Sequence, residues 1–141
     1  MTLDQFVESM ETRLFGLGRR LWPDDPLTQM REQADELSEE LHHRTAAVAR
    51  CKDALHETRV RLKQREMRAA QLHTHIETFV HVGDQTHAWQ YALELDQLRP
   101  AMQADRSEVE RLERQRGHLE SHVRQLERSL AGLQEKLYPN G

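Results

Sequence analysis

Apolar residues recur along the first half of the chain at alternating intervals of three and four. The series is Leu27, Met30, Ala34, Leu37, Leu41, Arg44, Val48, Cys51, Leu55, Thr58, Leu62, Arg65, Ala69, Leu72, Ile76 and Phe79. Only Arg44, Thr58 and Arg65 interrupt it, and most positions in between are polar. This spacing predicts a long helix over residues 27–82 with an apolar seam of the coiled-coil type.

A second seam with the same spacing begins at Ala88. It continues through Tyr91, Leu95, Leu98, Met102, Asp105, Val109, Leu112, Arg116, Leu119, Val123, Leu126, Leu130, Leu133 and Leu137. This pattern predicts a second helix over residues 87–138. Pro100 lacks a backbone donor and lies on the side away from the seam, so we expect it to kink this helix without ending it.

The stretch HVGDQTHAW, residues 81–89, separates the two seams. A reversal at Gly83 and Asp84 would place Leu72 opposite Leu95 and would bring Arg65 close to Asp105, a charge pair that would fix the register. The pattern therefore predicts an all-α fold, a long antiparallel two-helix coiled-coil hairpin with its tip at residues 83–86. The alternative is that these residues form a linker and that a partner chain buries each seam.

The helix ends carry their own signals. Gly83 suits the left-handed conformation that ends a helix, and Asp84 or Thr86 can cap the next one. Asp25 followed by Pro26 predicts a cap with Pro at the first helical position. We expect residues 139–141 to be a short tail. The expected hairpin core comprises Leu37, Leu41, Val48, Leu55, Leu62, Leu72, Ile76, Leu95, Leu98, Val109, Leu112, Leu119, Val123, Leu126 and Leu130.

Residues 1–22 have an amphipathic pattern of their own and predict a short N-terminal helix, which a joint rich in Pro and Asp at residues 23–26 separates from the hairpin. Arginines gather toward its end, next to a tryptophan, as in helices that lie in a membrane interface. The alternative is that the stripe packs on protein. The residues expected to contact lipid are Phe6, Val7, Met10, Leu14, Leu17, Leu21 and Trp22, with Arg13, Arg19 and Arg20 at the head groups.

Composition narrows the class of protein. Charged residues make up 31% of the chain and aromatic residues 5%, while Ala, Glu, Lys, Leu and Arg together supply about half, as in long helices. The net charge of -4 does not favour nucleic-acid binding. The chain has one cysteine and no apolar run of the ~20 residues that a membrane span needs, so we expect a cytoplasmic, at most peripheral, protein.

The sequence contains few candidates for catalytic, metal-binding or cofactor-binding residues. Nine histidines are present, but no Cys pair or His-Glu-x-x-His pattern accompanies them, and we expect no metal or cofactor. A two-helix hairpin has no enclosed pocket, so an enzyme is not expected. The basic stretch of residues 50–68 is expected to be a solvated face. Apolar residues off the seam gather at the tip, and Val82, Trp89 and Leu93 are candidates for a protein contact.

The layout resembles the phage-shock-protein A family, which includes the vesicle-inducing protein of plastids and is related to ESCRT-III. The similar stretches are DDPLTQMREQADELSEEL, GDQTHAWQYALELDQL and VERLERQRGHLESHVRQLERSLAGLQEKL. The family's tip pattern matches Asp84, Ala88, Ala92 and Leu93. The resemblance implies a membrane-stress or membrane-remodelling protein, peripheral on the inner membrane, that binds anionic lipids through residues 1–22 and self-associates through the hairpin.

Two further expectations follow from the resemblance. The chain ends at YPNG, without a counterpart of the family's further C-terminal helices, so we expect a short member. The alternative function is a soluble coiled-coil adaptor or regulator that binds a protein, such as an AAA+ activator or a full-length family member, without binding lipid.

Overall fold

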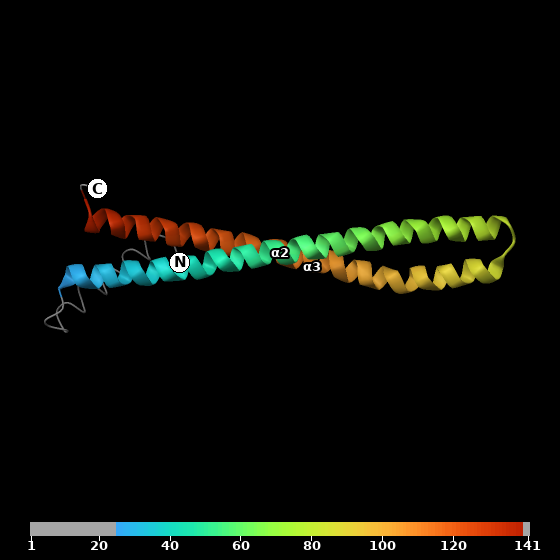
Figure 1. Cartoon of the computed structure of the whole chain (residues 1–141), viewed down its shortest axis with the longest axis horizontal. Helices are drawn as coiled ribbons and strands as arrows, with labels where there is room; N and C mark the ends of the chain where they lie inside the picture. The colour runs from blue at the N-terminus through green and yellow to red at the C-terminus, as the bar shows by residue number, and fades with distance from the viewer. Residues whose placement is uncertain (1–24, 140–141) are drawn as a thin grey trace. The chain divides into compact units, whose positions relative to one another are not determined.

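The computed structural model describes residues 25–139, which form two helices and contain no strand. Helix α2 spans Pro26–His81 and helix α3 spans Gln85–Leu137. The chain turns back between them and α3 packs along α2, which confirms the predicted hairpin (Figure 1). Helix α3 begins two residues earlier than the sequence predicts, because Asp84 and not Thr86 is its cap.

The start of α2 follows its sequence signal. The backbone N–H of Leu27 donates to Oδ1 of Asp25 at 3.1 Å, and the N–H of Gln29 donates to the carbonyl of Asp25 at 3.1 Å. Pro26 occupies the first helical position, where its missing N–H costs nothing. Asp25 is therefore the N-cap that the Asp-Pro pair predicts.

The reversal between the helices depends on Gly83, whose φ of 81° lies in the left-handed region. The N–H of Gly83 donates to the carbonyl of Val80, and the N–H of Asp84 donates to the carbonyl of Phe79 at 2.9 Å. This pair of bonds is the Schellman motif, which satisfies carbonyls that the end of a helix would otherwise leave without donors. Asp84 then caps α3, since its Oδ1 accepts from the N–H of His87 at 3.1 Å.

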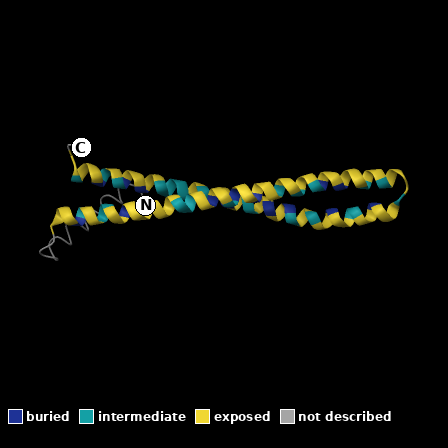
Figure 2. Ribbon diagram, in the orientation of Figure 1, coloured by how far each residue is buried: buried dark blue, intermediate teal, exposed yellow. Residues whose placement is uncertain are grey.

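The chain divides into two compact units, and the first, the tip unit, comprises Arg50–Arg116. Its core consists of Ala69, Leu72, Leu95 and Met102, with Leu62, Ile76, Tyr91 and Leu98 packed against them. Leu55 and Leu72 are almost completely buried. Figure 2 shows the buried positions on the sides of α2 and α3 that face each other. Two helices of one chain thus fill the seam of this unit.

The second unit, the terminal unit, contains the described residues up to Ala49 and from Gly117 onward. Leu37, Leu126 and Leu133 form its buried cluster, and Met30, Ala34, Leu41 and Leu130 pack against it. Gln29 and Ser129 are also buried, although neither belongs to the seam series. The seam spacing therefore locates the apolar cluster and does not locate these two polar side chains.

The expected core residues are all buried or half-buried. The buried ones are Leu37, Leu55, Leu72, Leu95, Leu112 and Leu126. The half-buried ones are Leu41, Val48, Leu62, Ile76, Leu98, Val109, Leu119, Val123 and Leu130. Of the other seam positions, Leu27 and Arg44 are exposed. Helix α3 continues through Pro100, which is exposed.

Two polar residues of the seam, Thr58 and Cys51, each have a hydrogen-bond partner. The hydroxyl of Thr58 donates to the carbonyl of Ala54 at 2.8 Å, so Thr58 is buried at low cost. The thiol of Cys51 donates to the carbonyl of Leu112 at 3.3 Å, which places this buried cysteine between the two helices of the tip unit. These two polar groups thus fit inside the seam without breaking it.

Candidate interaction surface at the tip

One carboxylate lies inside the seam of the tip unit. Asp105 has 3% of its surface exposed. Its Oδ2 accepts from Arg65 at 2.6 Å and its Oδ1 accepts from Arg61 at 3.0 Å. Burial alone would raise the pKa of Asp105, but the hydrogen bonds and positive charges of Arg65 and Arg61 outweigh burial and lower it. The sequence predicts the pair with Arg65, and the contact with Arg61 is an addition.

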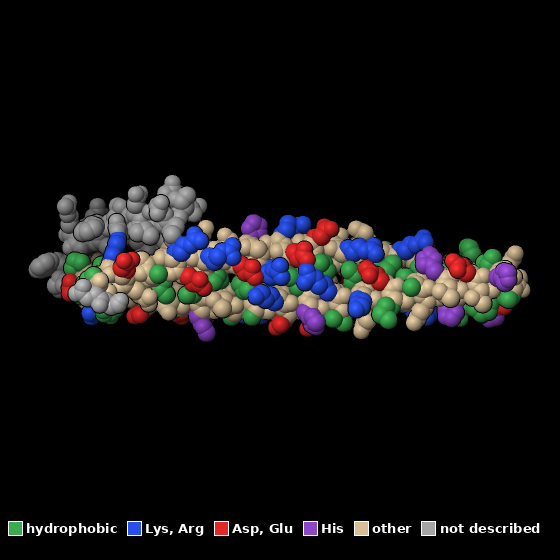
Figure 3. Space-filling model, turned by 90° about the horizontal axis from the view of Figure 1, so that it is seen from above, with side chains coloured by type: hydrophobic (Ala, Val, Ile, Leu, Met, Phe, Trp, Pro, Cys, Tyr) green, Lys and Arg blue, Asp and Glu red, His purple; other side chains and the backbone are tan. Residues whose placement is uncertain are grey.

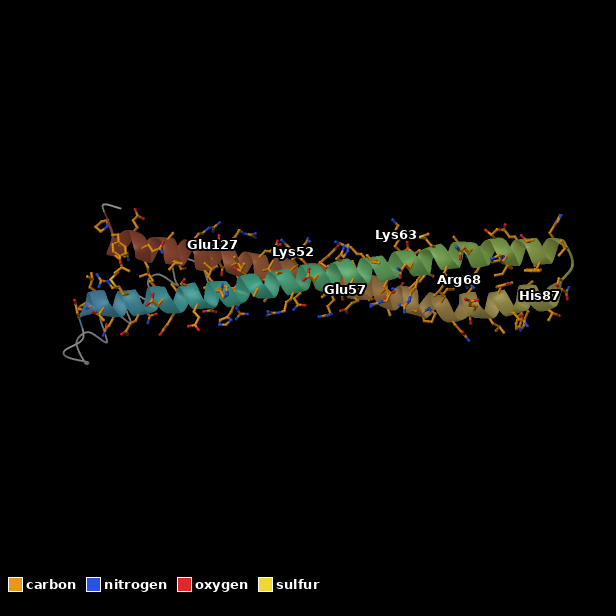
Figure 4. All side chains as sticks on the ribbon, in the orientation of Figure 1. Lys52, Glu57, Lys63, Arg68, His87 and Glu127 are labelled. Atoms are coloured by element: carbon orange, nitrogen blue, oxygen red, sulfur yellow. The ribbon has the colours of Figure 1, made fainter. Side chains whose placement is uncertain are left out.

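Further ion pairs join the exposed edges of α2 and α3. Arg68 forms a two-pronged contact with Glu94 at 3.0 Å, Arg59 pairs with Glu113, and Glu66 pairs with Arg106 at 3.6 Å. With Arg61 and Arg65, four of the seven cations in the basic stretch of residues 50–68 contact carboxylates of α3. Figure 4 labels Arg68 where it lies between the two helices. Arg59 and Arg61 are exposed, as expected of a solvated face, and the ion pairs of all four arginines with carboxylates of α3 are an addition to that expectation.

Stacked rings close the end of the hairpin. Phe79 lies 5.6 Å from Tyr91 and 5.1 Å from His87, and His75 lies 5.0 Å from Tyr91, measured between ring centroids. Nδ1 of His87 is 2.6 Å from Oδ2 of Asp84. Hydrogen bonds from the backbone and ring of His87 lower the pKa of Asp84. The aromatic rings and the Asp84 cap together hold the first turn of α3 against the last turns of α2.

The residues expected to make a protein contact are exposed. The exposed fraction is 67% for Val82, 66% for Trp89 and 46% for Leu93, and Val80 nearby is 60% exposed. These four are half of the eight large exposed hydrophobic residues in the described part of the chain. Hydrophobic and histidine side chains also gather at the tip on the face that Figure 3 shows. Such a concentration of apolar surface is typical of an interaction site.

A shallow, open hollow adjoins this apolar surface within the tip unit. The side chains that line it are His73 and Ile76 of α2 and Trp89, Ala92, Leu93, Leu95, Asp96 and Arg99 of α3. Residues 59, 66 and 73 are spaced by seven and share one flank of α2. Arg59 and Glu66 bridge to α3 by ion pairs, whereas His73 lines the hollow together with the small Ala92.

Charge at the tip has one sign. The sequence contains no Lys or Arg from residue 69 to residue 98, and its acidic residues there are Glu77, Asp84, Glu94 and Asp96. Glu94 is already paired with Arg68. An acidic apolar surface is not attracted to anionic lipids, so a protein surface suits it better.

The residues expected to contact lipid, all within residues 1–22, lie outside the described residues. Within the described part, no helix combines the length and the apolar character that crossing a bilayer requires. Among residues 25–139, no cluster of three or more His, Cys, Asp or Glu side chains has the arrangement of a metal site. Of the two histidines that flank the reversal, His81 and His87, the second contacts Asp84 and Phe79.

Comparisons of the chain with protein-family models, with curated proteins and with solved structures find no match.

Proposed function

We propose that this chain is a non-enzymatic, peripheral membrane protein of the phage-shock-protein A type, which binds anionic lipid through residues 1–22 and self-associates through its hairpin. The observation that supports it is that α2 and α3 fill the seam of each unit with their own side chains. The apolar stripe of residues 1–22 is then not needed to complete the hairpin. A lipid interface is a surface that such a stripe can cover.

The chemistry of the first 22 residues fits this role. The stripe from Phe6 to Leu21 supplies apolar area, and Trp22 is a side chain that prefers the interface between acyl chains and head groups. Three cations can contact phosphates, and three carboxylates balance them: Arg13, Arg19 and Arg20 against Asp4, Glu8 and Glu11. Binding should therefore depend mainly on apolar area, with a modest contribution from charge.

The hairpin would act as the body that the lipid-binding segment places at the membrane. We propose that α2 and α3 pair as an antiparallel coiled coil in both units and that copies of this body associate on the cytoplasmic face of the inner membrane. The interhelical ion pairs support the first part, because Arg59, Glu66 and Arg68 contact residues progressively nearer the reversal, namely Glu113, Arg106 and Glu94.

Co-sedimentation with liposomes tests lipid binding. The full chain should sediment with vesicles that contain an anionic phospholipid, and the double substitution Phe6→Glu and Leu14→Glu should leave it in the supernatant. Met67→Ala is the matched control, because it removes exposed apolar surface from α2, outside residues 1–22, and should not change sedimentation. Lipid binding that survives the double substitution, or a full chain that stays in the supernatant at low salt, would refute the proposal.

A second candidate function is that of a soluble adaptor that binds another protein without lipid. The observation that favours it is the exposed apolar surface of Val82, Trp89 and Leu93. The same assay separates the two candidates, since an adaptor would not sediment with vesicles of any composition.

A further inference from the structure

One flank of α3 near the reversal carries a continuous stripe, which we name the tip stripe: Trp89, Ala92, Leu93, Asp96 and Arg99. Their spacing of three and four places them on one side of the helix. Trp89 is 66% exposed, Leu93 is 46% exposed, and Asp96 and Arg99 are also exposed. The stripe thus begins with an exposed indole, continues through a leucine, and ends with a guanidinium.

Arg99 differs from the arginines near it. Arg68 and Arg106 each contact a carboxylate of the other helix, whereas Arg99 forms no ion pair with any residue between 25 and 139. Trp89 and Arg99 lie ten residues apart, about 15 Å along the helix, which is too far for a contact within one chain. A guanidinium and an indole that cannot meet within the chain are complementary across two chains, because an arginine packs favourably on the face of a tryptophan.

We propose that the tip stripe binds the same stripe of a second copy, in an antiparallel arrangement about a two-fold axis. When the stripes of two copies lie side by side in opposite directions, Trp89 of each chain lies opposite Arg99 of the other. It also places Asp96 opposite the small Ala92, and the two Leu93 side chains meet close to the axis. Each contact occurs twice, as the symmetry of a two-fold interface requires.

The charge of the tip stripe and its surroundings favours binding to a second copy of the chain over binding to a membrane. Arg99 is the one cation of the stripe and residues 69–98 contain none, so this surface has little to attract anionic head groups. Repulsion between two copies is small along the stripe, because Asp96 is its only acidic member and Glu94 beside it is neutralised by Arg68. Gln90 and Gln97 add an uncharged polar rim, of the kind that surrounds the apolar centre of an interface.

This inference names the surface for the self-association in the proposed function and rests on that part of it. It does not depend on lipid binding, so its test is made without lipid. The substitution Phe6→Glu with Leu14→Glu should leave association through the tip stripe unchanged. Loss of lipid binding and loss of this contact are therefore separate results.

Cross-linking through the two-fold axis is the most specific test. In the full chain with Cys51→Ser, Leu93→Cys should form a disulfide with its own copy on mild oxidation. Met67→Cys in the same background is the matched control, because Met67 is 58% exposed on α2 and is not in the stripe. Adding Trp89→Ala to the Leu93→Cys variant should abolish its cross-link without changing the helical circular dichroism spectrum.

Sedimentation equilibrium supplies the second measurement. The wild-type chain should show a concentration-dependent dimer, and Trp89→Ala should raise its Kd by more than about tenfold, as expected for a central aromatic residue. Arg99→Ala should raise it several-fold, and Met67→Ala should not change it. A chain that stays monomeric up to about 1 mM overturns the proposal. So does a dimer that tolerates Trp89→Ala, or a Leu93→Cys variant that oxidises to a dimer no faster than the Met67→Cys variant.

Discussion

At the scale of single residues, Asp105 is the side chain whose environment is most specific. Its side chain is 4% exposed and contacts two arginines, Arg65 and Arg61, that are themselves 34% and 49% exposed. Removing the carboxylate leaves the partly buried Arg65 without its counter-charge. We expect Asp105→Ala to lower the free energy of unfolding by about 2 kcal/mol, between the values for exposed and buried pairs. Urea unfolding followed by circular dichroism measures this change.

The matched control is Glu113→Ala. Glu113 and Arg59 also form an interhelical pair, but their side chains are 45% and 48% exposed, so the loss should stay below about 1 kcal/mol. Equal losses for the two alanine variants would contradict the special role of Asp105.

The pH dependence of stability provides a second check on Asp105. Because its pKa is lower in the folded state, its contribution is present above the pKa of about 3.9 in the unfolded state and is lost as the pH falls through the folded pKa. Asp105→Asn should remove the part of the loss of stability at low pH that arises from protonation of Asp105. Urea unfolding repeated at several pH values measures it, and an unchanged acid limb in Asp105→Asn would contradict the assignment.

At the scale of the helices, the seam of the tip unit should account for most of the stability of the α2–α3 pair. Leu72 has no exposed surface, and its truncation would leave a cavity among Ala69, Leu95 and Met102. We expect Leu72→Ala to cost about 3 kcal/mol in the free energy of unfolding. Val60 lies on the same helix but is 42% exposed, and Val60→Ala should change stability by no more than about 0.5 kcal/mol. Similar effects of both substitutions would mean that α2 and α3 are not held together by this seam.

The helices are largely predictable from sequence, and the surface contacts are not. A repeat of three and four locates Leu72 and Leu95 because it reports directly which side of a helix is apolar. The caps at Asp25 and Asp84 are equally local signals. The ion pair between Arg68 and Glu94 escapes prediction because it joins residues far apart in sequence. Its only sequence signal is charge at positions that flank the seam, which becomes informative once the register of the two helices is known.

At the scale of the whole molecule, we propose separate surfaces for separate tasks. Residues 1–22 would bind lipid, the seam would close the hairpin, and the tip stripe would bind a second copy. The charge pattern is consistent with this division, since the arginines of the first segment suit phosphate groups and the cation-free stretch of residues 69–98 does not. Of the candidate site residues, sequence identifies Trp89 and Leu93 by their position off the seam. It does not identify Arg99, whose lack of an ion-pair partner among residues 25–139 is visible only when both helices are in place.

A pair of cysteines tests whether α2 and α3 of one chain complete each other's seam. In the Cys51→Ser background, Arg68→Cys and Glu94→Cys place accessible thiols opposite each other on α2 and α3. A short thiol-reactive cross-linker should join them within one chain and give a product of monomer mass, near the 16.6 kDa of the polypeptide, at all protein concentrations. A product of dimer mass in place of the monomeric one would show that a partner chain fills the seam and would contradict the account.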